Sequence, residues 1–275
     1  NAKISVMTEA FHGRTLATLT ATGNVKVQKG FEPLVTGFVR VPFNDVEAIR
    51  SLQSDSDVAA VMLEVVQGEG GLSALSQGAL TEIRAICDAN QWLLMLDEVQ
   101  TGVGRTGKWF AHQIEGVKPD VMTLAKGLGS GVPVGALLTA GRATGVFHVG
   151  AHGTTFGGNP LAMCAALTTL DVIEADGLLA NAERQGRLIR DGLAQALSAE
   201  LAAAKVKGFR GAGLMIGVEL DRPCAELVKR ALDAGLLINV THDTVVRLLP
   251  PLVISDAESA ELVSRLAKVI QEFLA

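Results

Sequence analysis

The first half of the chain alternates short apolar runs with segments whose apolar residues recur at helical spacing. Runs rich in β-branched and aliphatic residues indicate strands, and the longer periodic segments indicate helices. Strands that alternate with helices are typical of an open, mostly parallel α/β sheet covered on both faces. The predicted strands are Lys3–Thr8, Val58–Val65, Trp92–Asp97, Asp120–Leu124 and Val134–Ala140. The predicted helices are Asn44–Ser54 and Ser76–Asn90, with Asn44 and Ser76 as expected N-caps.

From Asn159 onward the pattern changes to long helical segments and then to a smaller mixture of strands and helices. The predicted helices are Leu161–Ile173, Leu178–Leu201, Cys224–Ala234 and Asp256–Leu274. The predicted strands are a pair within Gly208–Leu220, followed by Leu236–Val240 and Val245–Leu249. Gly177 is the expected helix break, and Ser255 with Glu258 has the spacing of a capping box. We therefore expect a large domain over residues 1–170 and a smaller α+β domain, with its connecting helix, over 171–275.

Composition narrows the class of protein. With 275 residues, 48% of them hydrophobic, the chain can bury a large core. The net charge of −5 comes from interspersed acids and bases without a basic stripe, so nucleic acid is not an expected partner. Long apolar runs of membrane-span length are absent, so no membrane partner is expected. Cys87, Cys164 and Cys224 stand singly without metal-type spacing, which predicts buried thiols, a reducing cytoplasmic compartment and no metal.

The segment that follows the strand Trp92–Asp97 resembles a phosphate-binding loop. Residues Gly102 to Lys108 fit G-x-x-x-x-G-K, and the strand ends in two acids, Asp97 and Glu98. Residue Trp109 follows the lysine, however, and has no hydroxyl group for a metal ion. In a nucleotide site the loop and the acid also belong to different strands. An ATPase function is therefore a weak alternative.

A second glycine-rich segment lies just after the predicted strand Asp120–Leu124. Gly127, Gly129 and Gly131 suggest a dinucleotide fingerprint, but its sixth position is Val132, so the spacing fails. These glycines are also explained by tight turns alone.

Lys126 and Asp97 each end a predicted strand of the same sheet. In an open α/β sheet the carboxyl ends of neighbouring strands border one crevice. A lysine there can form a Schiff base, and a buried carboxylate can face a cationic ring nitrogen. These are the two groups that pyridoxal 5'-phosphate needs from a protein.

With these residues in place, the whole chain resembles the class-III pyridoxal-phosphate aminotransferases of fold type I, and within them the acetylornithine aminotransferases. The resemblance rests on ordered motifs along the full length of the chain. The motifs begin at Ala10 (AFHGRT), Val41 (VPFND), Glu64 (EVVQGEGG), Leu96 (LDEVQTG), Leu124 (LAKG), Gly153 (GTTFGGNP) and Arg247 (RLLPP). It implies an α/β fold with a mostly parallel sheet in a cofactor-binding large domain.

The resemblance also implies roles for residues around the cofactor. Lys126 is the expected Schiff-base lysine, and Asp97 pairs with the pyridine nitrogen. Gln100 bonds the ring hydroxyl, while Phe11 and Val99 press on the two ring faces. No chemical role is expected for His12, which is next to Phe11 in the sequence.

Substrate and partner contacts follow from the same resemblance. Arg247 would grip the α-carboxylate of glutamate or 2-oxoglutarate, and Glu69 would pair with Arg247 when a donor presents its distal amine. Arg14 would hold the carboxylate of an N-acylated ornithine, and Thr154 is a candidate substrate contact. Thr155 would reach the phosphate of the neighbouring subunit's cofactor, which implies a homodimer with shared sites.

The chain departs from the family pattern in several places. Val65 replaces a usual proline and Phe156 a common tyrosine. The family's N-terminal arm and its Gly/Ser/Thr-rich phosphate-binding turn precede the strand that starts here, so we expect the large domain to be incomplete and cofactor binding to be weaker.

The predicted activity is transfer of the distal amine of N-acetylornithine to 2-oxoglutarate in arginine biosynthesis. Alternative donors are ornithine, succinylornithine, succinyldiaminopimelate and 4-aminobutyrate, because a few pocket residues separate such substrates. A different alternative is a truncated, catalytically empty fragment.

Overall fold

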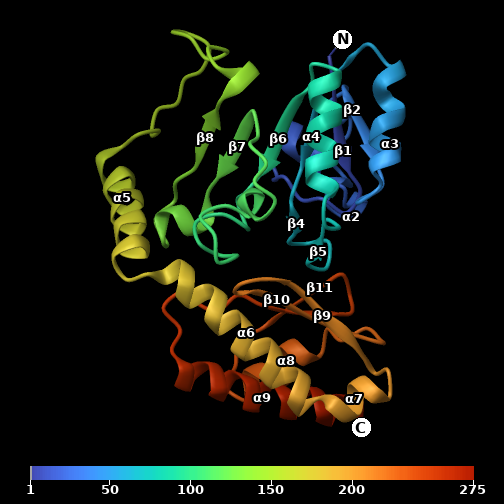
Figure 1. Ribbon diagram of the computed structural model, residues 1–275, viewed down its shortest axis with the longest axis vertical. Coiled ribbons are helices and arrows are strands. Elements are labelled where there is room, and N and C mark those ends of the chain that lie inside the picture. Colours follow the sequence, from blue (N-terminus) through green and yellow to red (C-terminus); the bar gives the residue numbers. More distant parts are fainter. Residues whose placement is uncertain (1) are drawn as a thin grey trace. The chain divides into compact units, whose positions relative to one another are not determined.

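The computed structural model describes residues 2–275 and divides them into two compact units (Figure 1). Unit 1 comprises the chain up to Gly68 together with 75–103 and 110–171. Unit 2 comprises residues 69–74, 104–109 and 172–275, so two short segments of the first half belong to the second unit.

Unit 1 is built on one six-stranded sheet in the order β2-β1-β3-β6-β7-β8. Its strands β2, β1, β3, β6 and β7 run parallel, and β8 pairs antiparallel with β7. The five strands predicted in this region are confirmed, whereas β2 was not predicted because it is short and carries an exposed arginine in its middle. The strands are β1 (Lys3–Met7), β2 (Phe38–Val41), β3 (Val58–Leu63), β6 (Leu93–Asp97), β7 (Val121–Leu124) and β8 (Ala136–Thr139).

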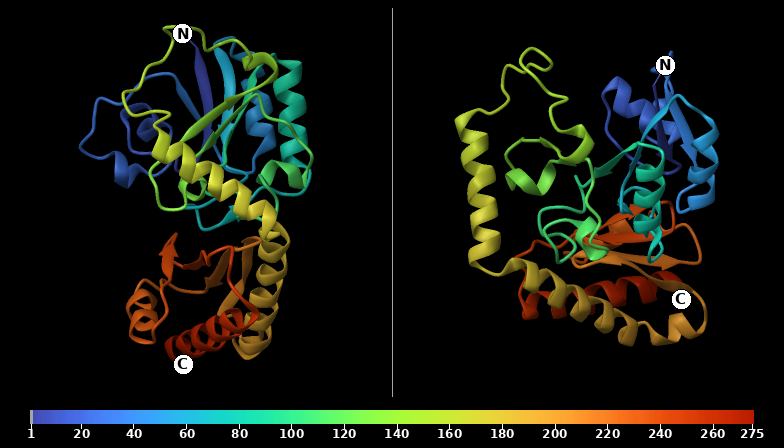
Figure 2. Two further views of the ribbon diagram at one scale, coloured as in Figure 1. Left: turned by 90° about the vertical axis from the view of Figure 1, so that its left-hand side faces the viewer. Right: turned by 45° about the horizontal axis from the view of Figure 1, so that its top comes forward.

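Two helices, α3 (Val46–Ser51) and α4 (Ala79–Ala89), pack together on the sheet. They lie next to each other in both views of Figure 2. In α4 the apolar residues fall on one face, which places Ile83 and Cys87 against the fully buried Leu94 of β6. This packing holds the middle strands of the sheet and therefore the positions of their carboxyl ends.

The expected N-caps of these helices are wrong. Asp45 caps α3, and Glu115 accepts backbone N–H groups at the start of α4. Asn44 and Ser76 bond each other instead, with Asn44 Nδ2 at 2.6 Å from Ser76 Oγ. The sequence offered two capping residues in a row at Asn44 and Asp45, and spacing alone does not choose between them.

The remaining elements of the first half are short, apart from one helix. The long helix α5 (Pro160–Ala175) confirms the prediction at Leu161–Ile173, and most of its residues are exposed. The prediction of buried thiols is wrong for Cys164, which lies on this exposed helix, and is confirmed for Cys87 and Cys224. The short elements are α1 (Leu16–Ala21), α2 (Val25–Gln28), β4 (Val66–Gln67) and β5 (Ser73–Ala74), with 3-10 turns at Leu52–Ser54, Ala111–Ile114, Lys126–Gly129 and Gly141–Ala143.

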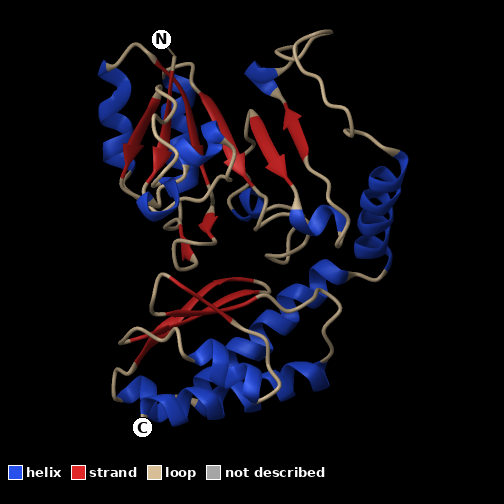
Figure 3. Cartoon of the chain, turned by 180° about the vertical axis from the view of Figure 1, so that it is seen from behind, coloured by secondary structure: helices blue, strands red, loops and turns tan. Residues whose placement is uncertain are grey.

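Unit 2 packs an antiparallel sheet, in the order β11-β12-β10-β9, against helices (Figure 3). Fully buried side chains of the sheet, such as Ile216, meet Ile189 of α6 and Ile270 of α9. The predicted elements are confirmed here with two exceptions. The helix expected over Leu178–Leu201 is two helices, and the strand expected over Leu236–Val240 begins only at Asn239. The observed elements are α6 (Leu178–Ala196), α7 (Ser198–Ala202), β9 (Val206–Ala212), β10 (Met215–Leu220), α8 (Leu227–Asp233), β11 (Asn239–Thr241), β12 (Val245–Leu248) and α9 (Asp256–Leu274).

Local sequence rules explain where two helices of unit 2 begin. Gly177 takes a left-handed φ of 61° immediately before α6, as expected for a helix break. Ser255 and Glu258 form the predicted capping box at the start of α9. The molecule is thus α/β, with a mostly parallel sheet and a smaller α+β part. Among the described residues, no helix has both the length and the apolar character that a bilayer crossing requires.

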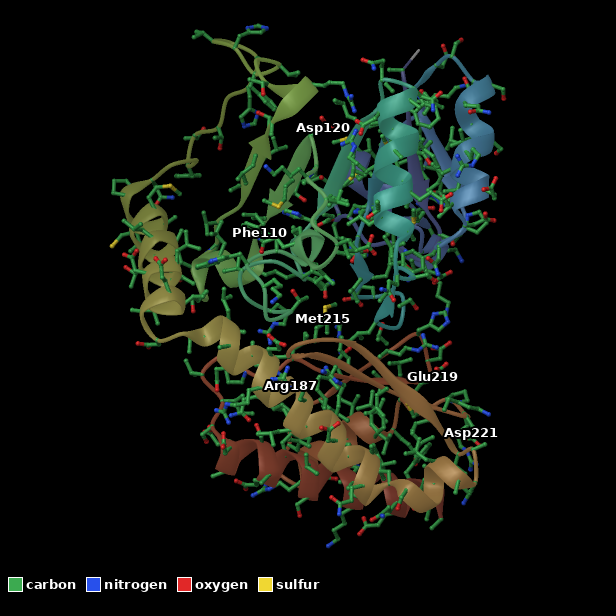
Figure 4. All side chains as sticks on the ribbon, in the orientation of Figure 1. Phe110, Asp120, Arg187, Met215, Glu219 and Asp221 are labelled. Atoms are coloured by element: carbon green, nitrogen blue, oxygen red, sulfur yellow. The ribbon has the colours of Figure 1, made fainter. Side chains whose placement is uncertain are left out.

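Asp120, at the start of β7, fastens this strand to β6 (Figure 4). Its Oδ2 accepts the Leu94 N–H at 2.9 Å and the Arg84 guanidinium at 2.7 Å, and the residue is 6% exposed. We expect Asp120→Ala to lower the free energy of unfolding by about 2–4 kcal/mol, because it leaves the buried Leu94 N–H without its acceptor and Arg84 with Asp88 as its remaining acidic partner. Urea unfolding measures this loss. Asp221→Ala, which removes an exposed partner of Arg222, is the control and should leave the midpoint nearly unchanged.

Candidate functional site

The centre of the candidate site is the buried carboxylate of Asp97, the last residue of β6. Its Oδ1 accepts the Val99 N–H at 3.1 Å and the Thr123 hydroxyl at 3.3 Å. Thr123 is its direct neighbour on β7. Its Oδ2 lies 2.8 Å from His12 Nδ1. The acid is therefore fixed in orientation by two strands and by the segment that follows β1.

His12 is a site residue that the sequence analysis left without a role. Its imidazole is fully buried, and its Nε2 has no hydrogen-bond partner among the described residues. Because Nδ1 faces a carboxylate, the ring both satisfies and orients Asp97. Its place directly after Phe11, near the end of a core strand, was the available sequence signal.

Glu64 is a second buried acid, just beyond the end of β3, and it is 3% exposed. Its two oxygens accept the Phe11 N–H at 2.9 Å and the Gly68 N–H at 3.1 Å. Burial raises the pKa of this carboxyl to about 7, with a further contribution from the nearby Asp97, while His12 and the two N–H groups oppose the rise. Glu64 thus ties the Phe11 backbone to the end of β3. Glu64 begins one of the family motifs, but its position in the sequence did not indicate this role.

Glu98 adjoins Asp97 but has a different function in the fold. It is 1% exposed, and its side chain accepts the N–H groups of Ala111 at 3.0 Å and of His112 at 2.9 Å. It also bonds the Thr101 hydroxyl. These contacts hold both ends of the turn region that follows β6. The role of Glu98 is therefore structural, and Asp97 is the acid that is a candidate for contact with a bound group.

Gln100 lies against the backbone of Gly68. A Cβ atom added at Gly68 would stand only 2.2 Å from Gln100 Oε1. The glycine in the segment after β4 therefore allows the Gln100 amide to occupy its place near the end of β6.

Lys126 follows β7, the strand next to β6, in a 3-10 turn. Its backbone φ is 42°, a left-handed conformation that is uncommon for a residue with a side chain. The residue is exposed. Since β6 and β7 are parallel neighbours, Asp97 and Lys126 leave the same edge of the sheet.

The other residues expected around the cofactor and substrate in unit 1 fall into two groups. Phe11 and Val99 are half-buried, and the Arg14 guanidinium lies 5.7 Å from the centre of the Phe11 ring. Thr154 and Thr155 are exposed on the loop that precedes α5.

In unit 2 the structure brings Glu69 and Arg247 together. Arg247 Nη1 donates to Glu69 Oε1 at 2.8 Å. The arginine side chain is 10% exposed, whereas that of the glutamate is 42% exposed, so the acid is the more accessible partner.

The side chains at this edge of the sheet can be compared with the chemical groups that they could bind. A buried carboxylate, an amine at the same sheet edge and a half-buried aromatic ring fit a cationic aromatic heterocycle that carries an aldehyde. No cluster of His, Cys, Asp and Glu suited to a metal ion occurs in residues 2–275. The segment after Lys108 forms only a 3-10 turn at Ala111–Ile114, whereas a phosphate-binding loop leads into a helix.

Known proteins of one family are similar to this chain over nearly its whole length. The family model for class-III aminotransferases matches residues 1–270. Acetylornithine aminotransferase 1 of Bordetella pertussis is 54% identical over 277 residues, covering 100% of this chain and 70% of that protein. Acetylornithine aminotransferase of Nitrosomonas europaea is 54% identical over 272 residues, covering 98% and 68%.

Two solved structures have the same fold. The ornithine aminotransferase from Toxoplasma gondii ME49 superimposes with a TM-score of 0.93 at 34% identity and covers 99% of this chain and 65% of that one. The N-acetylornithine aminotransferase from Stenotrophomonas maltophilia K279a gives 0.83 at 35% identity, with 99% and 66% covered. This chain therefore spans about two thirds of the length of the relatives that it matches.

Gly68→Ala is expected to displace the Gln100 side chain and to lower stability by about 1–3 kcal/mol, because the added methyl group overlaps the amide. Chemical denaturation measures the loss. The double variant Gly68→Ala/Gln100→Ala should recover most of it. Gly153→Ala, where a Cβ meets nothing within 4 Å, is the control. Equal losses in the single and double variants would contradict the contact.

Glu64 should make the protein less stable as the pH rises. Its carboxyl has a pKa of about 7 in the folded protein against an ordinary value of 4.5, so the folded form holds the proton more tightly and stability falls between these values. The fall is up to about 3 kcal/mol. The free energy of unfolding should be lower at pH 8 than at pH 5, and Glu64→Gln should remove the part of this difference that comes from Glu64. Glu115→Gln, which also loses an acceptor of two backbone N–H groups but is less buried, should retain it.

Proposed function

Because this chain belongs to the class-III aminotransferases, we propose that it transfers the distal amino group of N-acetylornithine to 2-oxoglutarate, a reaction of arginine biosynthesis. The observation that carries the proposal is the buried, fully oriented Asp97 at the sheet edge from which Lys126 also leaves. The 54% identity to two acetylornithine aminotransferases supports the choice of donor. A cytoplasmic location remains a prediction from the sequence.

Pyridoxal 5'-phosphate, when bound, would supply a ring that accepts electrons as the C–H bond breaks on the substrate carbon that bears the reacting amine. Asp97 would hold a proton on the ring nitrogen, and Gln100 would bond the ring hydroxyl. Phe11 and Val99 would contact the ring faces. The backbone bond from Phe11 to Glu64 supports this arrangement, because it ties the aromatic residue to the end of a core strand.

Lys126 would take the proton from the substrate carbon that bears the amine and would deliver it to the carbon of the cofactor's aldehyde group. The Val99 N–H, the Thr123 hydroxyl and His12 would hold the Asp97 side chain in the orientation that its role at the ring nitrogen needs.

Carboxylate recognition falls to two arginines. Arg247 would bind the α-carboxylate of glutamate or 2-oxoglutarate, and Glu69 would neutralise Arg247 while an amine donor reacts. The observed 2.8 Å pair corresponds to the second of these states. Arg14 would bind the carboxylate of the acylated ornithine, and Thr154 would contact substrate.

We also propose a homodimer in which Thr155 reaches the cofactor phosphate of the other subunit. Large apolar side chains are exposed on β8, in the loop after it and on α5, and the proposed dimer interface would cover apolar side chains of this kind. These side chains are Leu137, Leu138, Val146, Phe147, Val149, Phe156, Leu161 and Leu167.

Two kinds of alternative remain open to experiment. Ornithine, succinylornithine, succinyldiaminopimelate or 4-aminobutyrate could be the donor, and a solved ornithine aminotransferase has the same fold with a TM-score of 0.93. A catalytically empty fragment is the alternative of another class.

Addition of pyridoxal 5'-phosphate should give an absorbance band that borohydride removes, because the Lys126 amine bonds the aldehyde. Lys126→Ala should lose this reaction and retain less than about a thousandth of the transfer rate. Lys108→Ala is the matched control and should keep both properties. Identical spectra for the unsubstituted protein and Lys126→Ala would support the empty fragment. Rates with N-acetylornithine, ornithine and 4-aminobutyrate as donors then identify the substrate.

A further inference from the structure

The Glu69–Arg247 pair belongs to a larger set of contacts on one face of the antiparallel sheet of unit 2. Asn239 lies directly opposite Arg247 in the pairing of β11 with β12, and Thr241 lies two residues farther along β11 on the same face. Both polar side chains therefore reach the side of the sheet on which Arg247 meets Glu69.

Each member of the pair is held by one of these two residues. Arg247 Nη2 donates to Asn239 Oδ1 at 3.1 Å, while Nη1 is bonded to Glu69. The buried Thr241 hydroxyl donates to the Glu69 carbonyl oxygen at 2.5 Å. Thus Asn239 holds the guanidinium through the nitrogen that Glu69 does not use, and Thr241 holds Glu69 through its backbone.

The rest of the segment Glu69–Ala74 is fastened to the same sheet face. Arg210 Nη1 lies 3.3 Å from the Gly71 carbonyl oxygen and 3.2 Å from Ser73 Oγ. Arg210 also pairs with Glu219, which is labelled on β10 in Figure 4. A Cβ atom at Gly217 would stand 3.4 Å from Leu72 Cβ, which shows how closely the segment approaches the strand. The backbone of this segment is fixed, while the Glu69 side chain is 42% exposed and has room to turn.

We infer that Asn239 and Thr241 are positioning residues for opposite halves of the reaction. The inference rests on the proposed function. When Glu69 releases Arg247, Asn239 keeps the guanidinium in place to receive the α-carboxylate of 2-oxoglutarate. When an amine donor binds, Thr241 keeps the Glu69 backbone where its carboxylate reaches Arg247. The side chain then turns about a fixed Cα atom, and the arginine stays in position in both states.

The test is a comparison of the two half-reactions, each followed separately in the cofactor-loaded protein. Asn239→Ala should raise the KM for 2-oxoglutarate about tenfold, the loss expected for one hydrogen bond to a charged group, and should change the KM for N-acetylornithine by less than about twofold. Thr241→Val should show the reverse, with about a tenfold rise for N-acetylornithine. Thr241→Ser keeps the hydroxyl and should restore the normal value.

A second measurement does not depend on activity. In Thr241→Val the backbone amides of Glu69 and Gly70 should exchange hydrogen faster than in the unsubstituted protein, because the link to β11 is gone. Thr244→Val is the matched control, since its hydroxyl bonds the His242 carbonyl oxygen within the turn between β11 and β12. It should change neither the KM values nor the exchange.

The outcomes separate this inference from the proposed function. Equal losses in the two half-reactions, or unchanged amide exchange in Thr241→Val, overturn the positioning roles alone. Arg247→Ala is the reference, and it should abolish saturation with 2-oxoglutarate. If the unsubstituted protein performs neither half-reaction, or if Arg247→Ala binds 2-oxoglutarate normally, the proposed function fails and the inference fails with it.

Discussion

The candidate site depends on one constraint, which is that a carboxylate buried at the end of a core strand must be met by donors. Asp97 is 6% exposed, and it is met by a backbone N–H, a threonine hydroxyl and the His12 imidazole. Its donors come from the residues just after β6, from β7 and from the segment after β1. Burial of the acid is therefore favourable only where these three parts of the chain meet. The packing that brings them together also places the carboxylate at the edge of the sheet.

Glu64 and Glu98 show how the protein separates structural from reactive acids. Each accepts two backbone N–H groups, so each ties a loop to the end of a strand. Asp97 differs in directing one of its oxygens to an imidazole. Three buried acids near two neighbouring strand ends would repel one another if all were charged. The pKa of Glu64 is raised mainly by its burial, and the nearby Asp97 adds to the rise.

The strands and helices could be predicted from the sequence because they follow the spacing of its apolar residues. Apolar runs revealed the core strands, and the Ser255 capping box marked the start of α9 at its observed residue. The pairing of Glu69 with Arg247 was expected only through family resemblance, because 178 positions separate the two residues. His12 and Glu64 were missed for a physical reason. Their roles come from hydrogen bonds across the fold, and neither spacing nor composition along the chain encodes such contacts.

The segment from β8 to α5 illustrates the opposite error, where sequence predicts burial that a single chain does not provide. The sequence of α5 is apolar on most sides, a pattern usually found in buried helices. Yet Leu161 is 73% exposed and Leu167 is 61% exposed. A helix of this composition gains little from facing water, since its apolar area contributes to stability only when another surface covers it. The proposed homodimer would cover these side chains, and the exposed Thr155 precedes the same helix in the chain.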